Sequence, residues 1–231
     1  MTHSFVRLLE HDAATFILSL DSDPLIGRII RGDAEHHEYV RFLVGTYHYV
    51  RWSGVLLART AKGLRRRGRS PALVALVEAK TTEEAPHDRW ALDDLRVLGV
   101  DPELVKGEPA PAAVLGYVQS HLAWADAGSA AFLGAAHSLE LLSMRRASEA
   151  AKNLRRSRRI ADIERAVSFL EGHGEADIEH VRVLEGHLAA LADDEERAAV
   201  SLSASHLRAL FPLFFAGPQL VEARPALRAS A

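Results

Sequence analysis

The chain has 231 residues, of which 48% are hydrophobic and 26% charged, a composition that excludes a disordered or fibrous protein. Its net charge of -3 gives no overall attraction to nucleic acid or to an acidic membrane surface. The absence of cysteine excludes disulfides, thiolate metal ligands and a cysteine nucleophile. No apolar run reaches the ~18 residues of a membrane span, and the first residues do not resemble a signal peptide. We therefore expect a cytoplasmic protein that binds neither membrane nor nucleic acid.

Apolar residues recur at steps of three and four along most of the chain, and this period predicts an all-α fold. No internal repeat or linker divides the chain, so we predict one domain over residues 1–217, a bundle of roughly seven helices, and a frayed tail over residues 218–231. We expect the main helical stretches, the third of them interrupted by Pro86, at residues 5–20, 33–66, 71–98, 112–125, 130–156, 162–171, 177–191 and 194–210.

The most specific local pattern is a His-x3-Asp-x2-His spacing formed by His173, Asp177 and His180. On one helix these positions fall within about 60° of one another, so two imidazoles and a carboxylate would converge as in a metal site. An alternative interpretation rests on Gly172 and Gly174, which are poor helix formers. In that case His173 lies in a turn, and Asp177 is only the N-cap of the next helix.

A second pattern places Glu84 three residues before His87, so a carboxylate and an imidazole share one helical face. The alternative is a capping box with Thr81 as N-cap and Glu84 at the third helical position. Pro86 would then remove a hydrogen bond inside the helix, so the backbone is expected to be irregular in either case. Irregular helix beside a carboxylate and a histidine is common at functional sites.

The third candidate is Glu140, which lies on a mostly apolar helical stripe near Leu133, Ala136 and Leu141. A carboxylate buried there needs a partner or a metal, because burying an unpaired charge costs several kcal/mol. The alternative is that Glu140 is simply exposed at the surface.

Together these patterns give three carboxylates and three imidazoles from three separated segments. Oxygen and nitrogen ligands without sulfur favour iron or manganese over zinc, and helical bundles hold paired metals in this way. The four positive charges of two ferrous ions would nearly balance the three carboxylates. We therefore predict two iron ions, or manganese, at a catalytic site formed by Glu84, His87, Glu140, His173, Asp177 and His180.

Three segments, EEAPHDRWALDDL, FLGAAHSLELLS and FLEGHGEADIEHV, resemble in order and spacing the ligand helices of the heme-oxygenase-like diiron oxidases, or iron-containing redox enzymes. The resemblance extends from about Asp33 to Leu210. It implies a seven-helix fold, often dimeric, that binds two irons reversibly and activates dioxygen. The expected function is oxidation of a small organic substrate, such as an amine, amino acid or fatty acid, in a biosynthetic step. The expected partners are dioxygen, that substrate and a second copy of the chain.

The resemblance includes one departure. Members of this family place the first glutamate ligand three or about seven residues before the histidine, and here the latter position is Lys80, which cannot ligate a cation while protonated. Glu84 is therefore the predicted ligand, with Glu83 as the fallback, and the second metal is expected to bind more weakly. The same fold also hosts heme oxygenases and thiaminase-like enzymes. The N-terminal region has no distinctive heme-ligand histidine motif, with His11 as the one alternative left open, and the sequence lacks the cysteine nucleophile usual in thiaminase-like enzymes.

Two further expectations concern the substrate and a rival function. On the helix expected over residues 33–66, Tyr47 and Arg51 share a face, and we predict that Arg51 holds a substrate carboxylate in a bidentate clamp. Alternatively, Arg51 reaches solvent or pairs with a glutamate. The rival function is a non-catalytic binding or scaffold protein that uses the basic clusters at residues 62–69 and 145–159. No aromatic residues are interleaved there to stack on bases.

Overall fold

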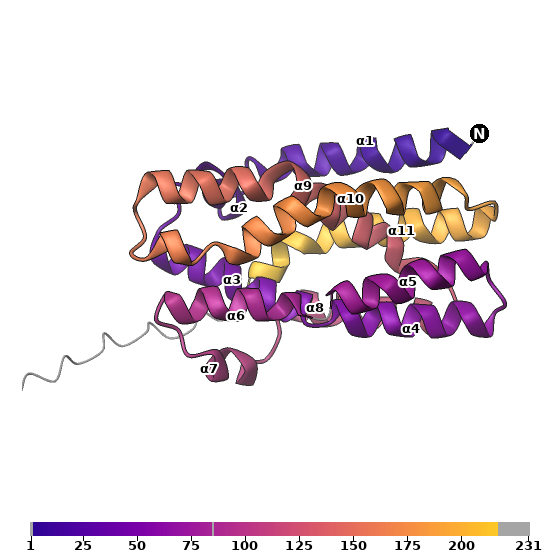
Figure 1. Cartoon of the computed structure of the whole chain (residues 1–231), viewed down its shortest axis with the longest axis horizontal. Helices are drawn as coiled ribbons and strands as arrows, with labels where there is room; N and C mark the ends of the chain where they lie inside the picture. Colours follow the sequence, from indigo (N-terminus) through magenta and orange to yellow (C-terminus); the bar gives the residue numbers. More distant parts are fainter. Residues whose placement is uncertain (1, 85, 217–231) are drawn as a thin grey trace, which may run out of the picture.

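The computed structural model describes residues 2–84 and 86–216, and every regular element in these residues is helical (Figure 1). The elements are α1 (Thr2–Leu20), α2 (Ile26–Arg31), α3 (His36–Val50), α4 (Ser53–Arg66), α5 (Pro71–Glu84), α6 (His87–Val97), α7 (Pro102–Gly107), α8 (Ala112–Asp126), α9 (Phe132–Ser157), η1 (Ile163–Arg165), α10 (Ser168–Ala189), α11 (Asp194–Leu210) and η2 (Phe211–Phe215). The predicted all-α single domain is confirmed. The tail predicted at residues 218–231 lies outside the described residues.

Several helices begin and end where the local sequence supplies a cap. The Asp193 carboxylate accepts hydrogen bonds from the backbone N–H groups of Glu195 and Glu196 at the start of α11. Glu35 and Glu38 form a reciprocal capping box at the start of α3. At the end of α2, Gly32 takes a left-handed conformation with a φ of 76°, which an ordinary side chain would strain. These local signals explain why most boundaries follow from the sequence.

The described residues form more helices than the seven predicted, partly because the long helix expected over residues 33–66 is two helices. α3 ends at Val50 and α4 begins at Ser53. Between them the backbone makes a tighter, 3₁₀-type turn, in which the N–H of Trp52 donates to the carbonyl of Tyr49, three residues earlier. This break changes which side chains of the two helices face the interior.

The opposite correction applies to the segment that carries the His-x3-Asp-x2-His pattern. The expected helices over 162–171 and 177–191 are replaced by the short η1 and one continuous helix, α10. The two glycines inside α10 mark close packing: a Cβ on Gly172 would lie 2.6 Å from the Trp90 ring, and one on Gly174 would lie 2.2 Å from the Ser148 hydroxyl. Tertiary packing therefore outweighs the low helix propensity of both glycines.

The longest helix, α9, is central to the bundle and packs against α1, α2, α10 and α11 (Figure 1). Leu133 and Leu141 are buried on it, and each contributes about 1.5–3 kcal/mol to stability by leaving water. Gly134 allows α11 to approach closely, since a Cβ there would lie 1.9 Å from the carbonyl oxygen of Val200. α9 also packs against α10, and each of these two helices carries candidate ligands.

One stretch of the described residues, Asp194–Phe215, has the length and apolar composition of a membrane span. It coincides with α11 and η2, and α11 packs against α8 and α9 through the buried Val200, Ala204 and Leu207. This face is the buried part of the stretch, and 39% of its most apolar window lies inside the fold.

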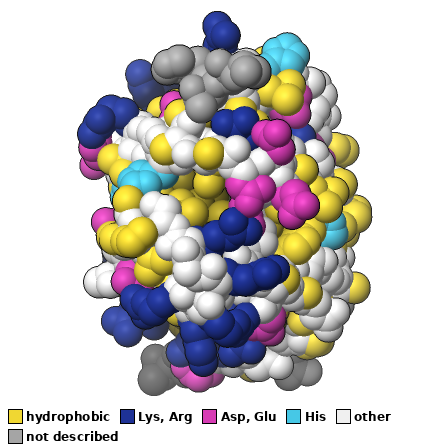
Figure 2. All heavy atoms as spheres, turned by 90° about the vertical axis from the view of Figure 1, so that its right-hand side faces the viewer, with side chains coloured by type: hydrophobic (Ala, Val, Ile, Leu, Met, Phe, Trp, Pro, Cys, Tyr) yellow, Lys and Arg dark blue, Asp and Glu magenta, His cyan; other side chains and the backbone are white. Residues whose placement is uncertain are grey.

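The basic cluster at residues 62–69 lies at the end of the bundle that holds the turn between α4 and α5. Figure 2 shows this end with Lys and Arg side chains lying beside Asp and Glu side chains. Arg65 pairs with Glu78, and Arg69 pairs with both Asp193 and Glu196. Pairing of these cations favours the interpretation of the cluster as a solvated surface.

Candidate metal centre

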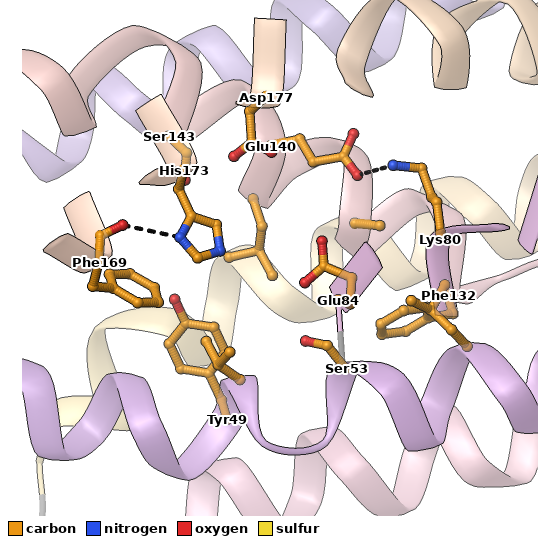
Figure 3. Close-up of a pocket in the computed structure, with 14 residues that line it drawn as sticks. Tyr49, Ser53, Lys80, Glu84, Phe132, Glu140, Ser143, Phe169, His173 and Asp177 are labelled. Carbon is orange, nitrogen blue, oxygen red and sulfur yellow. Dashed lines mark hydrogen bonds and ion pairs between the residues drawn. The ribbon is translucent and has the colours of Figure 1, made fainter. Parts of the chain in front are cut away.

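A cavity of about 60 Å³ lies between the break that separates α3 from α4 on one side and α5, α9 and α10 on the other (Figure 3). Polar side chains from three helices reach it: Lys80 and Glu84 from α5, Glu140 from α9, and His173 and Asp177 from α10. Four of the six predicted ligands therefore line one cavity. The apolar part of its wall includes Val50, Leu57, Phe132, Leu139 and Phe169.

Glu84, His87 and His173 form a tight group in which one ligand atom from each residue lies within 4.8 Å of the other two. His87 Nδ1 lies 3.3 Å from Glu84 Oε2, is buried, and makes no hydrogen bond among the described residues. One carboxylate and two imidazoles at this separation have the chemistry of a divalent transition-metal site. The motifs found about 90 residues apart in the sequence therefore meet in space.

Glu84 and His87 lie on either side of a helix boundary, because α5 ends at Glu84 and α6 begins at His87. The capping-box alternative is wrong: Thr81 lies inside α5, and its hydroxyl donates to the carbonyl of Val77. The irregular backbone expected around Pro86 is the boundary itself. On α6 the ring of Trp90 stacks on His87 with 4.3 Å between ring centroids, which fixes the orientation of the imidazole.

His173 is presented by the middle of α10. Its Nδ1 lies 3.0 Å from the carbonyl oxygen of Phe169, one turn earlier, so Nδ1 carries the proton and Nε2 is left as an acceptor (Figure 3). Burial lowers the pKa of His173, although Asp177 and the Phe169 carbonyl oppose this effect. A neutral imidazole is the form that binds a metal. The alternative in which His173 lies in a turn and Asp177 caps a new helix is wrong.

Asp177 and His180 lie one turn apart on α10, beyond His173. His180 Nδ1 is 3.0 Å from Asp177 Oδ1, and this hydrogen bond is the main reason that the pKa of His180 is raised. His180 Nε2 is 3.5 Å from an oxygen of Glu83, the fallback ligand, whose side chain is half exposed. His180 thus contacts both Asp177 and Glu83.

Glu140 is buried, so the alternative that it is exposed at the surface is wrong. Its Oε1 accepts from the ammonium group of Lys80 at 2.6 Å, while Oε2 is buried without a hydrogen-bond partner among the described residues (Figure 3). Burial raises the pKa of Glu140 to about 7 against the opposing effect of Lys80, and nearby Asp177 and Glu84 add to the rise. The sequence marks Lys80 only as a position that lacks a carboxylate, and it gives no sign of this ion pair.

Burial and the neighbours of Glu84 act in opposite directions on its carboxyl group. Burial alone would raise the pKa of Glu84, but the adjacent His87, followed by His173 and Lys80, outweighs burial and lowers it. Glu84 is therefore ionised at neutral pH. An ionised carboxylate is ready to accept a cation without first losing a proton.

A residue that the sequence did not single out, Asp94 on α6, holds the start of α10. Its Oδ1 accepts from the N–H and the hydroxyl of Ser168, and its Oδ2 accepts from the N–H of Phe169. Asp94 is buried and thus acts as an N-cap supplied by a different helix. α6 therefore both supplies His87 and fixes the helix that carries His173.

The structure corrects the predicted substrate-binding residues. Because the helix breaks after Val50, the cavity is lined by Tyr49, Val50 and Ser53 rather than by Tyr47 and Arg51. The Arg51 guanidinium instead lies over the ring of Tyr47, with 5.5 Å from its central carbon to the ring centroid. Figure 3 shows the hydroxyl of Tyr49 pointing towards His173. Tyr49 was missed because the apolar period continues across the break and predicts one helix with a different inner face.

Residues 40–210 match the protein family described as iron-containing redox enzyme. The match covers most of the chain, so this protein belongs to that family, and the predicted family resemblance is confirmed. Among curated proteins, no sequence matches this chain.

Solved structures share the architecture at low sequence identity. A domain of unknown function with a heme oxygenase-like fold from Shewanella denitrificans superimposes with a TM-score of 0.79 at 19% identity, covering 91% of this chain and 90% of that chain. A TenA homologue from Pseudomonas syringae pv. tomato gives 0.71 at 13% identity, with coverages of 92% and 91%. One from Pyrococcus furiosus gives 0.68 at 13% identity, with coverages of 92% and 98%. The predicted heme-oxygenase-like fold is confirmed.

Proposed function

We propose that this protein is a non-heme iron oxidase or oxygenase that uses dioxygen to oxidise a small organic substrate, such as an amine, an amino acid or a fatty acid. The observation that carries the proposal is the convergence of Glu84, His87 and His173 to within 4.8 Å in a chain of the iron-containing redox enzyme family. A second group, Glu140, Asp177 and His180, supplies the donors for a second ion. We further propose that the protein is cytoplasmic and forms a homodimer.

The residues present fit iron. Two buried imidazoles and a lowered-pKa carboxylate form the first group, and the unpaired Oε2 of Glu140 marks an unused anionic donor at the second. Oxygen and nitrogen donors without sulfur are the ligands of non-heme iron and manganese sites. Glu84, His87 and His173 would hold one ion, and Glu140, Asp177 and His180 would hold the other.

Iron bound at this centre would supply dioxygen activation and the oxidising power. The apolar wall formed by Val50, Leu57, Phe132 and Phe169 excludes bulk water from the cavity. Tyr49 keeps its phenolic proton, because burial and the nearby Glu84 raise the pKa of its hydroxyl. That Oη proton is available to a group bound beside His173, while the Ser53 side chain lines the opposite part of the wall.

The cavity limits what binds in this conformation. Its volume of about 60 Å³ accommodates ions, water and dioxygen but is well below the roughly 300–1,000 Å³ typical of small-molecule sites. An organic substrate therefore requires the surrounding helices to move apart, and the break between α3 and α4 is the element placed to allow it. Apolar residues on the wall favour substrates with an aliphatic portion.

Two experiments test the proposal. Anaerobic titration with ferrous iron followed by metal analysis should show at least one ion bound per chain. Oxygen uptake by the iron-loaded protein should then rise with a member of a panel of amines, amino acids and fatty acids. A protein that binds no iron, or that holds a single zinc in preference to iron, would contradict the assignment.

The likeness to TenA homologues concerns the fold, since identity to them is only 13%. Thiaminase-like chemistry on this fold usually uses a cysteine nucleophile, and this chain has no cysteine. A scaffold function offers no reason for burying three carboxylates and two imidazoles around one cavity, an arrangement that costs stability unless something binds there. The iron centre is therefore the function that the site supports best.

A further inference from the structure

One of the side chains that line the cavity, that of Lys80, is itself a cation. Lys80 is only 3% exposed, and its ammonium group donates to Glu140 Oε1 at 2.6 Å (Figure 3). It lies one helical turn before Glu84 on α5, so both side chains face the same cavity. A fully buried lysine is rare and costly unless it is paired, so this position requires an explanation.

The ammonium group competes with a second metal ion for the same carboxylate. One oxygen of Glu140 is held by Lys80, and only the buried, unpartnered Oε2 remains available. An ion placed between Glu140 and Asp177 would approach the ammonium group closely, and two cations repel strongly in a poorly solvated cavity. The first group, Glu84, His87 and His173, does not include Glu140 and escapes this competition.

Charge balance also indicates that the two metal positions are unequal. The three carboxylates Glu84, Glu140 and Asp177 are neutralised by Lys80 together with one divalent ion. A second divalent ion would leave two excess positive charges in a buried site, which is unfavourable. Displacing Lys80 from Glu140 would relieve the repulsion and free the second oxygen of the carboxylate.

We propose that Lys80 is a built-in competitor for the second metal position. The protein then binds one divalent ion tightly at Glu84, His87 and His173, and the second ion binds only when Lys80 leaves Glu140. This inference rests on the proposed iron centre and adds to it the residue that makes the two metal positions unequal. A purely structural ion pair would have no such effect on metal stoichiometry.

The test is to remove the charge of Lys80 while keeping most of the length of its side chain. Purified protein stripped with a chelator is dialysed against increasing Mn²⁺, and against Fe²⁺ under anaerobic conditions, and the bound ion is measured by metal analysis. The wild-type chain should bind one ion tightly and a second weakly. Lys80→Met should bind the second ion at least about tenfold more tightly than the wild type, while the first ion is little changed.

Three further variants locate the effect. Lys106→Met removes a different lysine, exposed and paired with Glu103, and should bind metal like the wild type. Lys80→Arg keeps the charge and should also retain the wild-type pattern. In Lys80→Met combined with His180→Ala, the tightened second ion should be lost, because His180 belongs to the second group. If Lys80→Met does not fold, as judged by circular dichroism, Lys80→Gln removes the charge but retains a donor for Glu140.

The outcomes separate the two proposals. If the wild type binds two ions with equal affinity, or if the neutral Lys80 variants leave second-ion affinity unchanged, the role of Lys80 is wrong while the metal centre stands. If the wild type and the neutral variants bind no ion, both proposals fall. A second ion that tightens only when the charge is removed supports the competition.

Discussion

The Nδ1 atom of His173 lies 3.0 Å from the carbonyl oxygen of Phe169, one turn earlier on the same helix. A carbonyl oxygen can only accept, so the contact places the proton on Nδ1 and directs Nε2 towards Glu84 and His87. The tautomer is thereby set by the backbone of α10 before any metal arrives, as is common for metal-binding histidines.

His173→Ala should therefore abolish binding of the tight ion, lowering its affinity at least about a hundredfold, because one of three ligand atoms is lost. The helical content should change little, since the side chain faces a cavity. Ferrous titration and circular dichroism check both expectations. His37→Ala, which removes an exposed histidine of α3, is the control and should bind iron like the wild type.

Glu84→Gln tests whether this carboxylate is a ligand. The amide keeps the size of the side chain but loses the anionic oxygen that a metal prefers, so the affinity of the tight ion should fall about tenfold or more. The melting temperature without metal should stay within a few degrees of the wild type, because Glu84 caps no helix. The matched control is Glu83→Gln, whose half-exposed side chain approaches His180 at 3.5 Å. A larger loss for Glu83→Gln would move the ligand role to Glu83.

Asp94→Ala should lower stability by about 1–3 kcal/mol, because three hydrogen bonds to the start of α10 are lost and buried N–H groups become unsatisfied. It should also weaken the tight metal site, since α10 carries His173. Asp101→Ala removes an exposed N-cap from the short α7 and serves as the control. That control should lose about 1 kcal/mol at most and bind metal normally. Urea unfolding and ferrous titration measure the two effects.

His121 should make the protein sensitive to mild acid. It is 1% exposed, and burial lowers its pKa from 6.5 to about 4. A histidine with a folded-state pKa below its unfolded value takes up protons mainly on unfolding. Its contribution to stability is therefore complete above pH 6.5 and is lost as the pH falls towards 4. Between pH 7.5 and pH 5 the loss from this residue amounts to about 2 kcal/mol.

Urea unfolding of the metal-free protein at the two pH values checks this expectation. His121→Phe keeps an aromatic ring of similar size and cannot titrate, so its stability should fall less on acidification than that of the wild type. The variant is expected to be less stable overall, because the Ser203 hydroxyl loses its 2.9 Å contact with His121 Nε2. An equal pH dependence in both proteins would show that His121 does not remain neutral by burial.

Two helical glycines should respond to alanine in opposite ways. In Gly134→Ala the new methyl group would lie 1.9 Å from the carbonyl oxygen of Val200, so α9 and α11 must separate. We expect a loss of about 1–3 kcal/mol. In Gly116→Ala the methyl group meets nothing within 4 Å, and alanine should stabilise α8 by about 0.5–1 kcal/mol. Thermal unfolding of both variants measures the difference.

The helical spacing of the apolar residues predicted the all-α fold, and the short motifs predicted three segments that meet at the site. Both patterns can be recognised from residues that are close together in the sequence. The break at Trp52 and the continuity of α10 were not predictable in the same way. At the first, the apolar period continues from α3 into α4, and Gly54 just after the break fits the same helical face. The second depends on Trp90 and Ser148 packing against the glycines of α10, which only the folded chain brings together.

The interactions that organise the site are also non-local. Lys80 pairs with Glu140 across 60 residues of sequence, and Asp94 contacts Ser168 across 74. A single sequence does not show which residues so far apart along the chain contact each other in the fold. From the sequence, Lys80 is notable only as one of the two positions at which the family resemblance allows the first glutamate ligand, and no pattern points to Asp94.

Because α6 carries His87 at its first residue and also holds the start of α10 through Asp94, the ligand geometry is preorganised. His87 begins the helix and Asp94 follows two turns later, a separation of roughly 10 Å along a rigid rod. A tilt of α6 moves His87 and the Asp94 contact with the start of α10 together. His87 and His173 therefore keep their spacing through small motions of the bundle. A metal entering the site finds its ligands already assembled, and little conformational entropy remains to be lost when it binds.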